Sequence, residues 1–309
     1  MTRRLLLCAC LLLPPACRRT EEAPRHAVPL AANGELRLTI TTFNIRYEEP
    51  KETDWRGWPN RIQRMVAAIR KMDPDIMGMQ EVLHGQAADL RASLPDYEFE
   101  GVGRDDGKRN GEYSAIFYRR DRFEKTGGGT FWLSDHPAVP GSIDWGNSLT
   151  RTATWLHLTD RQSGRGFYVF NTHWDHKNEE SRERAAKLMV ARINAREHLD
   201  EPVVLTGDFN SRAGMPGIDY LTGKTVTIDD RRLPAWEHPL IDTYQALHPD
   251  EKNRRTLHFW TGDFDGDLKV DFVMVSQGAK IEAADILRAK TREMQPSDHY
   301  PVWAKVVWK

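Results

Sequence analysis

The sequence predicts an α/β fold in which two packed β-sheets carry helices on their outer faces. Three observations support this prediction. Strand-like runs recur along most of the chain, segments with helical spacing of apolar residues lie between them, and neither a tandem repeat nor a second linker interrupts them. Strands that look mostly antiparallel, interspersed with helices, suit two sheets packed face to face. We therefore expect one domain over residues 36–309 of the 309-residue chain.

Residues 1–17 have the shape of a secretory signal peptide. Two arginines precede a short apolar stretch, which falls short of the roughly 20 residues that a membrane-spanning helix needs. Cleavage between Ala16 and Cys17 would leave an N-terminal cysteine, as in a bacterial lipoprotein, although Pro14 and Pro15 stand where a lipobox has an aliphatic and a small residue. We expect an exported protein, either periplasmic or membrane-anchored through lipidation of Cys17.

A polar tether is expected between this leader and the folded domain. Residues 18–35 are rich in Pro, Ala and charged residues, a composition that suits a linker. The three cysteines of the chain, Cys8, Cys10 and Cys17, all precede the tether. The domain is therefore expected to contain neither a disulfide nor a thiolate metal site.

The first half of the domain alternates strand and helix signals. Residues 36–45 alternate Leu and Ile with Arg and Thr and predict a strand. Pro59 suits the first turn of a helix, whose apolar face would carry Ile62, Met65, Ile69 and Met72. Further signals follow in order: a short apolar run at 75–82, helical spacing at Ala87, Leu90 and Leu94, and strand-like runs at 112–119, 129–134, 151–158 and 166–173.

The second half begins with a helix over roughly 179–198, which carries Ala185, Leu188 and Ile193 at helical spacing. A buried strand follows at 203–210. Residues 211–268 look irregular, and two final strands are expected at 270–276 and 299–308.

Polar side chains stand where several of these strands end. Asp208 and Asn210, with Phe209 between them, end the apolar run that starts at Val203. Because side chains alternate along a strand, both point to the same side. A carboxylate buried without a partner is costly, so these groups are expected to face something positive. The same feature recurs at Asn44, Glu81, Asn171, His173, Asp271, Asp298 and His299.

Such a collection of side chains suits phosphate chemistry. Carboxylates, carboxamides and imidazoles without cysteine form a site for a hard cation, Mg²⁺ or alternatively Mn²⁺. The metal neutralises phosphate oxygens, and a base turns water into an attacking hydroxide. The sequence therefore predicts a metal-dependent hydrolase of phosphate esters.

Seven segments, in this order, resemble the endonuclease/exonuclease/phosphatase superfamily: TFNIRY, MQEV, GEYSAIFYRR, FNTHWDH, TGDFN, KVDFVMV and SDHYPV. That superfamily includes deoxyribonuclease I, apurinic endonucleases, sphingomyelinases, inositol-polyphosphate 5-phosphatases and the deadenylase/nocturnin group. The resemblance covers roughly residues 36–308. It implies a four-layer α/β sandwich, with two mixed or antiparallel sheets flanked by helices, and metal-dependent cleavage of a phosphate ester by an activated water.

The resemblance implies catalytic roles for five residues. Asp208 matches the residue that orients or deprotonates the attacking water, and Asn210 matches a neighbour that holds the phosphate. His299 matches the imidazole that contacts the scissile phosphate, and Asp271 the carboxylate that fixes its tautomer and favours its charged form. His173 stands where the family places another phosphate-contacting side chain.

The resemblance also implies a metal site and substrate contacts. Glu81 matches the principal metal ligand, with Asn44 and Asp298 in the same site. In the apurinic-endonuclease branch an acid commonly stands two residues after the Asn. Here that position is Arg46, which favours a one-metal site; Arg46 would then meet an anionic substrate or pair with a site acid. The expected substrate-binding residues are Tyr113, Arg46, Arg151, Asn171 and His258.

The expected function is a Mg²⁺-dependent phosphoesterase that cleaves a phosphodiester or a phosphomonoester, with an extracytoplasmic small molecule or lipid headgroup as substrate. One alternative is a secreted nuclease acting on DNA or RNA. Duplex DNA is not expected as the main partner, because the net charge is −1 and no long basic stripe is visible. Membrane contact is expected only through the N-terminal lipid.

A second alternative is a catalytically silent surface lipoprotein that keeps the fold for binding. A decayed enzyme should have lost at least one catalytic group. All of the groups in question are present, namely Glu81, Asp208, Asp271, Asp298 and His299. The sequence therefore favours the enzyme.

Overall fold

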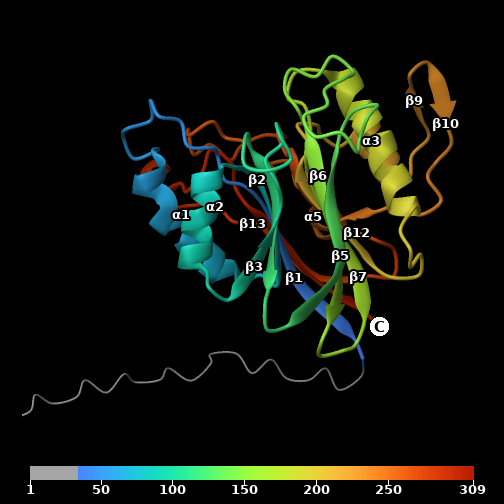
Figure 1. Cartoon of the computed structure of the whole chain (residues 1–309), viewed down its shortest axis with the longest axis horizontal. Helices are drawn as coiled ribbons and strands as arrows, with labels where there is room; N and C mark the ends of the chain where they lie inside the picture. The colour runs from blue at the N-terminus through green and yellow to red at the C-terminus, as the bar shows by residue number, and fades with distance from the viewer. Residues whose placement is uncertain (1–33) are drawn as a thin grey trace, which may run out of the picture. The chain divides into compact units, whose positions relative to one another are not determined.

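The structure, a computed structural model, describes residues 34–309. Two six-stranded sheets pack face to face, and helices cover their outer faces (Figure 1). This arrangement confirms the predicted α/β sandwich. The expected signal peptide, the lipidation site Cys17 and most of the linker lie outside the described residues. Within residues 34–309, no helix combines the length and the apolar character that crossing a membrane requires.

The first sheet carries helices α1 (Trp58–Met72) and α2 (His84–Ser93) on its outer face (Figure 1). Strand β1 runs parallel to β2, and every other neighbouring pair in this sheet is antiparallel. Its strands, in spatial order, are β13 (Lys280–Ile286), β14 (Val302–Trp308), β1 (Leu36–Asn44), β2 (Ile76–Val82), β4 (Tyr113–Arg119) and β3 (Tyr97–Glu100).

The second sheet is covered by α3 (Glu179–Asn194) and α4 (Pro216–Leu221) (Figure 1). Here β7 and β8 are parallel and the other pairs are antiparallel. Its strands, in spatial order, are β11 (Ile241–Asp242), β12 (Asp271–Val275), β8 (Val203–Asp208), β7 (Gly166–His173), β6 (Thr152–Asp160) and β5 (Phe123–Trp132). The remaining elements are a hairpin of β9 (Val226–Ile228) and β10 (Arg231–Leu233), helix α5 (Thr243–Leu247) and a 3₁₀ turn at Arg292–Met294.

Three separate apolar cores hold the four layers together. The central core lies between the sheets, and the two outer cores lie between each sheet and its helices. Alternation along β1 shows how one strand serves two cores: Leu38 and Ile40 enter the central core, whereas Phe43 packs under α1 and α2. The same alternation turns Asn44, at the end of β1, toward the space between the sheets.

The sequence missed elements at the sheet edges. β3, β13 and β5 are edge strands, and an edge strand has fewer apolar residues because fewer neighbours cover it. β5 begins at Phe123 rather than near residue 129 and runs through three consecutive glycines, Gly127 to Gly129. The stretch 211–268, expected to be irregular, contains α4, α5 and short strands.

Candidate active site

Three adjacent strands of the second sheet carry polar residues side by side at one edge of the sheet, where β7 and β8 end and β12 begins. His173, at the end of β7, is the register partner of Asp208, at the end of β8, and Asp208 is in turn the partner of Asp271 on β12. All three are on the strand faces that look into the space between the sheets. Strand pairing therefore brings together residues that are 98 positions apart, from His173 to Asp271.

Asp208 lies at the centre of the site. Asn44 donates from its amide nitrogen to Asp208 at 2.9 Å and to Glu81 at 3.0 Å. The Nε2 atoms of His173 and His299 lie 3.5 and 3.8 Å from the same Asp208 oxygen. Burial, together with the nearby negative charge of Asp271, raises the pKa of Asp208 to about 7.

The two imidazoles near Asp208 differ in charge. Burial alone would lower the pKa of His299, but Asp271, whose oxygen accepts from Nδ1 at 2.9 Å, raises it to about 10. His173 has no such partner at hydrogen-bond distance. Its burial, followed by the positive charge of Arg151, lowers its pKa well below the usual value. Near neutral pH, His299 is therefore a cation and His173 is neutral.

A β-bulge turns Glu81 toward this site. Strict alternation on β2 would place Glu81 with Met77 and Met79 in the core under the helices. The register with β4 instead shifts between Met79 and Val82, and Glu81 takes a φ of 60°. Its carboxylate accepts from Asn44 and from the backbone N–H of Tyr47. Burial alone would raise its pKa, but the charge of His299 and the Asn44 hydrogen bond leave it below the usual value.

Asp298, Asn210 and Arg46 surround this centre. Asp298 is 9% exposed, and burial together with the charge of Glu81 raises its pKa. Asn210, at a φ of 46°, donates from its side chain to the carbonyl of Trp174, and its backbone N–H donates to Asp208. Arg46 lies 3.9 Å from Glu81 and 3.3 Å from Glu52, so it pairs with a site acid, which was one of the two expectations for it.

Within residues 34–309, two groups of side chains place possible ligand atoms within 4.8 Å of one another: Glu81, His173 and Asp208, and Asp208, Asp271 and His299. In the second group, Asp271 and His299 are already bonded to each other. The first group fits a divalent cation better, because that bond occupies Asp271 and His299, whereas the carboxylates of Glu81 and Asp208 are oxygen donors that suit Mg²⁺ or Mn²⁺.

The sequence also placed Asn44 and Asp298 among the metal ligands. The amide of Asn44 donates to both acids, and its oxygen accepts from the backbone N–H of Arg46. Asn44 thus positions Glu81 and Asp208, and its expected role as a metal ligand stays a prediction. Asp298 is held beside the site by Ser297, whose hydroxyl also donates to the carbonyl of Asn44.

Two residues expected to contact the substrate have structural roles. Asn171 is fully buried, and its side chain donates to the carbonyls of Met79 and Ala115 and accepts from Gln80 and Thr206. These four hydrogen bonds saturate a carboxamide, so Asn171 links the two sheets and has no hydrogen-bonding capacity left for substrate.

Tyr113 belongs to the core under α1 and α2. Its hydroxyl contacts Nδ1 of His84 and donates to the carbonyl of Lys108. The side chain of Tyr113 thus has a structural role on the outer face of β4, while the residue also lines the small pocket beside His173, where its substrate contact stays a prediction.

His258 and Arg151 are both buried, His258 against other side chains and Arg151 at the wall of a small pocket. His258 is fully buried, its ring packs 4.1 Å from that of Tyr300, and its backbone N–H donates to the carbonyl of Asp298. Burial lowers the pKa of His258 to about 3. The backbone of His258 thus supports Asp298, and the expected substrate contact of its side chain stays a prediction. Arg151 lines a small pocket beside His173.

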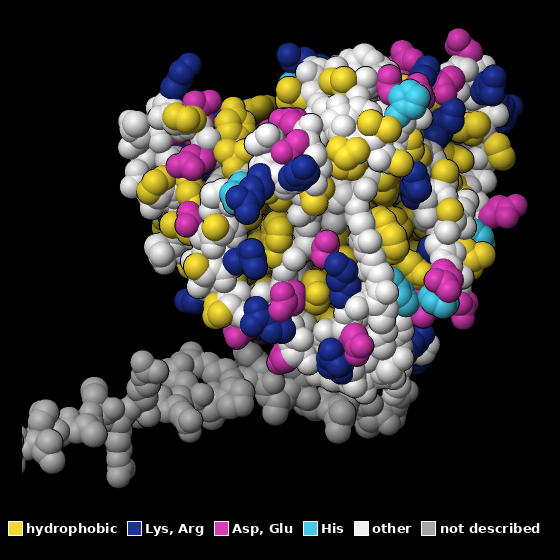
Figure 2. Space-filling view, in the orientation of Figure 1, with side chains coloured by type: hydrophobic (Ala, Val, Ile, Leu, Met, Phe, Trp, Pro, Cys, Tyr) yellow, Lys and Arg dark blue, Asp and Glu magenta, His cyan; other side chains and the backbone are white. Residues whose placement is uncertain are grey.

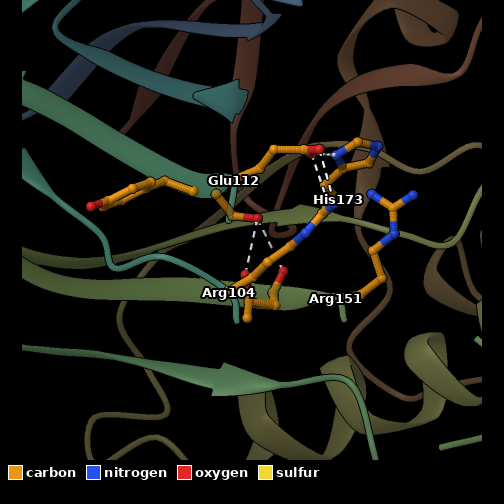
Figure 3. A pocket seen from close by; sticks show the side chains of 7 residues that line it. Arg104, Glu112, Arg151 and His173 are labelled. Carbon is orange, nitrogen blue, oxygen red and sulfur yellow. Dashed lines mark hydrogen bonds and ion pairs between the residues drawn. The ribbon is translucent and has the colours of Figure 1, made fainter. Parts of the chain in front are cut away.

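Glu112 and Arg104 complete this pocket and were missed by the sequence analysis. Arg104 donates to both oxygens of Glu112, at 2.7 and 2.9 Å, and Glu112 lies 3.8 Å from Nδ1 of His173 (Figure 3). Burial and the charge of Glu81 raise the pKa of Glu112 to about 7. Alternation in the run 112–119 would have found it, because Glu112 shares a strand face with Ser114 and Ile116, the latter in the central core.

Arg61 is a second residue that the sequence analysis missed. It lies on α1, is 0% exposed, and donates to the backbone carbonyls of Ile45, Arg46, Tyr47 and Pro296. These carbonyls belong to the segments that carry Asn44 and Asp298. No local pattern marked this residue, since one arginine among several on a helix usually faces solvent.

Buried acids around a charged imidazole, at the strand ends of a two-sheet sandwich, suit the hydrolysis of phosphate esters. A sequence model described as the Endonuclease/Exonuclease/phosphatase family matches residues 41–299. The chain belongs to this family, as its motifs predicted.

Similarity to solved structures covers most of the chain. A mannosyl-6-phosphatase from Bacteroides thetaiotaomicron is 32% identical, with 87% of this chain and 99% of that chain covered and a TM-score of 0.75. An endonuclease/exonuclease/phosphatase protein from Bacteroides vulgatus is 35% identical, with 88% and 98% covered and a TM-score of 0.76.

A probable RNA exonuclease from Schizosaccharomyces pombe is a more distant relative. It is 25% identical over 247 residues, which are 75% of this chain and 48% of that protein. The chain thus spans about half the length of this curated relative.

Proposed function

We propose that the protein is a divalent-metal-dependent phosphatase that cleaves a phosphate monoester of a small molecule. The observation that carries the proposal is the arrangement of Asp208 between a neutral His173 and a cationic His299, at 3.5 and 3.8 Å. Sites whose environments push the pKa values of neighbouring groups apart assign acid and base roles to them. Here the cationic imidazole of His299 suits contact with a phosphate oxygen, and the carboxylate of Asp208 suits proton abstraction from a water.

Asp208 is the general base in this proposal. Its pKa of about 7 matches the condition for efficient proton transfer near neutral pH. Asn44 and the backbone N–H of Asn210 hold the carboxylate in place. His299, kept protonated by Asp271, offers its Nε2–H on the side of Asp208, where it would bind and neutralise a phosphate oxygen.

Glu81 would be the principal ligand of the metal ion, with His173 nearby, so that Asp208 remains free to act on the water. A bound divalent metal supplies charge neutralisation at the phosphate and lowers the pKa of water. Hard carboxylate donors favour Mg²⁺ or Mn²⁺ for this role.

The relatives support a small phosphorylated substrate over a nucleic acid. The Bacteroides phosphatase is 32% identical to this chain, whereas the RNA exonuclease is 25% identical. On the face of residues 34–309 shown in Figure 2, Lys and Arg alternate with Asp and Glu, and no continuous basic stripe crosses that face. Nucleic-acid backbones are normally bound by such a stripe.

The proposal extends to location. The leader at residues 1–17 and the position of Cys17 support export and lipidation, and hence an extracytoplasmic substrate. Cell fractionation and lipid labelling of the full chain beside Cys17→Ser test this part. A soluble cytoplasmic protein in both cases would contradict it.

The catalytic proposal is tested with the purified protein and four substrate types: mannose 6-phosphate, p-nitrophenyl phosphate, bis-p-nitrophenyl phosphate and a short RNA. Each is assayed with Mg²⁺, Mn²⁺ or chelator. We expect metal-dependent hydrolysis with preference for the monoesters, and a loss of at least ~10²-fold in Asp208→Asn. Asp250→Asn, an exposed acid, is the matched control. Full activity in Asp208→Asn would remove the assigned base, and preference for RNA would make the protein a nuclease.

A further inference from the structure

A small polar pocket adjoins the catalytic centre. It encloses a volume of about 150 Å³, part of it open to solvent, and Figure 3 shows Glu112 between Arg104 and His173, with Arg151 beside His173. The pocket reaches the reacting centre through His173, whose other ring nitrogen lies 3.5 Å from Asp208. Its lining residues are Arg104, Glu112, Tyr113, Ser114, Arg151, Thr152 and His173.

Hydrogen-bond donors in this pocket lack acceptors. The side chain of Arg151 is 3% exposed, and its Nε and Nη1 atoms have no partner, while its Nη2 donates to His176 at 3.0 Å. The Nε atom of Arg104 is also buried without a partner. Buried donors in proteins are nearly always paired, so something that accepts hydrogen bonds is expected to enter the pocket.

The charges, by contrast, are already balanced. Glu112 is bonded to Arg104 through both oxygens, and Asp175 lies 3.9 Å from Arg151. The pocket therefore needs acceptors rather than a net negative charge. A second phosphate would also lie against the carboxylate of Glu112, and like charges at close range repel.

A hydroxyl group meets both requirements of the pocket: it accepts hydrogen bonds from the arginines, and it adds no negative charge. It accepts from an arginine N–H and donates to a carboxylate oxygen, because a hydroxyl is donor and acceptor at once.

We propose that Arg104, Glu112 and Arg151 form a subsite that binds a hydroxyl group on the alcohol part of the substrate. The substrate class is thus a phosphorylated polyol or sugar rather than an alkyl or aryl phosphate. This inference rests on the proposed phosphatase function and gives it a specificity determinant. A pocket with buried polar groups discriminates strongly against an analogue that lacks the matching hydroxyl, since those groups are then left unpaired.

The test compares kcat/KM for hydroxylated and plain phosphates of similar size. The hydroxylated panel is mannose 6-phosphate, glucose 1-phosphate, ribose 5-phosphate and glycerol 3-phosphate, and the plain substrate is n-hexyl phosphate. The ratio of the two values is the readout, because it cancels effects on the shared phosphate chemistry. The variants are Glu112→Gln and Arg104→Met, and Arg109→Met, an exposed arginine on the same loop, is the control.

We expect the wild-type protein to favour its best hydroxylated substrate by at least ~10²-fold. In Glu112→Gln and Arg104→Met that ratio should fall by at least ~10-fold, mainly through KM, while turnover of n-hexyl phosphate persists and shows that the protein is folded. Arg109→Met should keep the wild-type ratio.

Two results would overturn the inference while leaving the phosphatase intact: equal use of n-hexyl phosphate by the wild type, or a ratio unchanged in both variants. Hydrolysis of no monoester at all would instead remove the proposed function on which the inference rests.

Discussion

Replacing Asn171 by alanine tests whether this residue has a structural role or contacts the substrate. The side chain of Asn171, on β7, reaches the first sheet and donates to the carbonyls of Met79 and Ala115 at 2.9 and 2.8 Å. These two residues are register partners of β2 and β4, at the place where the bulge before Val82 interrupts the ladder. Asn171 therefore supports the bulge that turns Glu81 toward the site.

The cost of the substitution follows from the four hydrogen bonds. Met79 and Ala115 would each keep a buried carbonyl without this donor, at about 1–3 kcal/mol per group. Gln80 and Thr206 lose less, because Gln80 also donates to Thr42 and Thr206 to the carbonyl of Phe170. A loss of about 3 kcal/mol is expected, a substantial part of the 5–15 kcal/mol that stabilises a typical protein.

Urea denaturation measures this loss, and a thermal melt should show a fall of about 6 °C or more. Asn110→Ala, an exposed asparagine, is the control and should change the melting temperature little. Activity below the melting transition should persist with KM unchanged when the metal is saturating, because the bulge that Asn171 supports carries the metal ligand Glu81 and not a substrate contact. If Asn171→Ala had wild-type stability and a raised KM, Asn171 would be a substrate contact and the structural reasoning would be refuted.

Three further predictions concern the site. Glu81→Gln should raise the Mg²⁺ or Mn²⁺ concentration for half-maximal activity by at least ~10-fold, because it removes a charged ligand; a metal titration of activity measures this. Asp271→Asn should move the alkaline limb of the kcat/KM profile down by about 1–3 pH units. In the wild type, the pKa of His299 is raised to about 10, so the stability gained from its protonation is complete below pH ~6.5 and is lost as the pH rises through 10. Arg61→Met should destabilise the fold by about 2 kcal/mol or more, measured by urea denaturation, because buried carbonyls lose a charged donor.

Each of these predictions has an opposing outcome. An unchanged metal titration would remove Glu81 from the ligands. Coincident pH profiles for the wild type and Asp271→Asn would mean that His299 does not act as a cation. For Arg61, the exposed Arg70 provides the matched control, and equal stability of Arg61→Met and Arg70→Met would show that the backbone contacts of Arg61 add nothing.

The periodicity of apolar and polar residues along the chain was sufficient to predict the fold class and much of the site. Alternation along a strand is set by backbone geometry, so the sequence alone places Asp208 on one face and Phe209 on the other. The order of strand and helix signals then predicts two sheets with outer helices. The edge strands escaped this reasoning because solvent, rather than a second core, covers part of them.

Contacts between distant segments decided the remaining features. Glu81 points into the site only because a bulge in β2 breaks its alternation, and that bulge rests on Asn171 from the other sheet. Glu112 rather than Tyr113 faces the centre, although both stand at the start of β4. Whether a polar side chain is free for substrate depends on the partners that folding brings to it. Those partners come from other strands, which is why hydrogen-bond saturation at Asn171 and the lack of acceptors at Arg151 are properties of the tertiary structure alone.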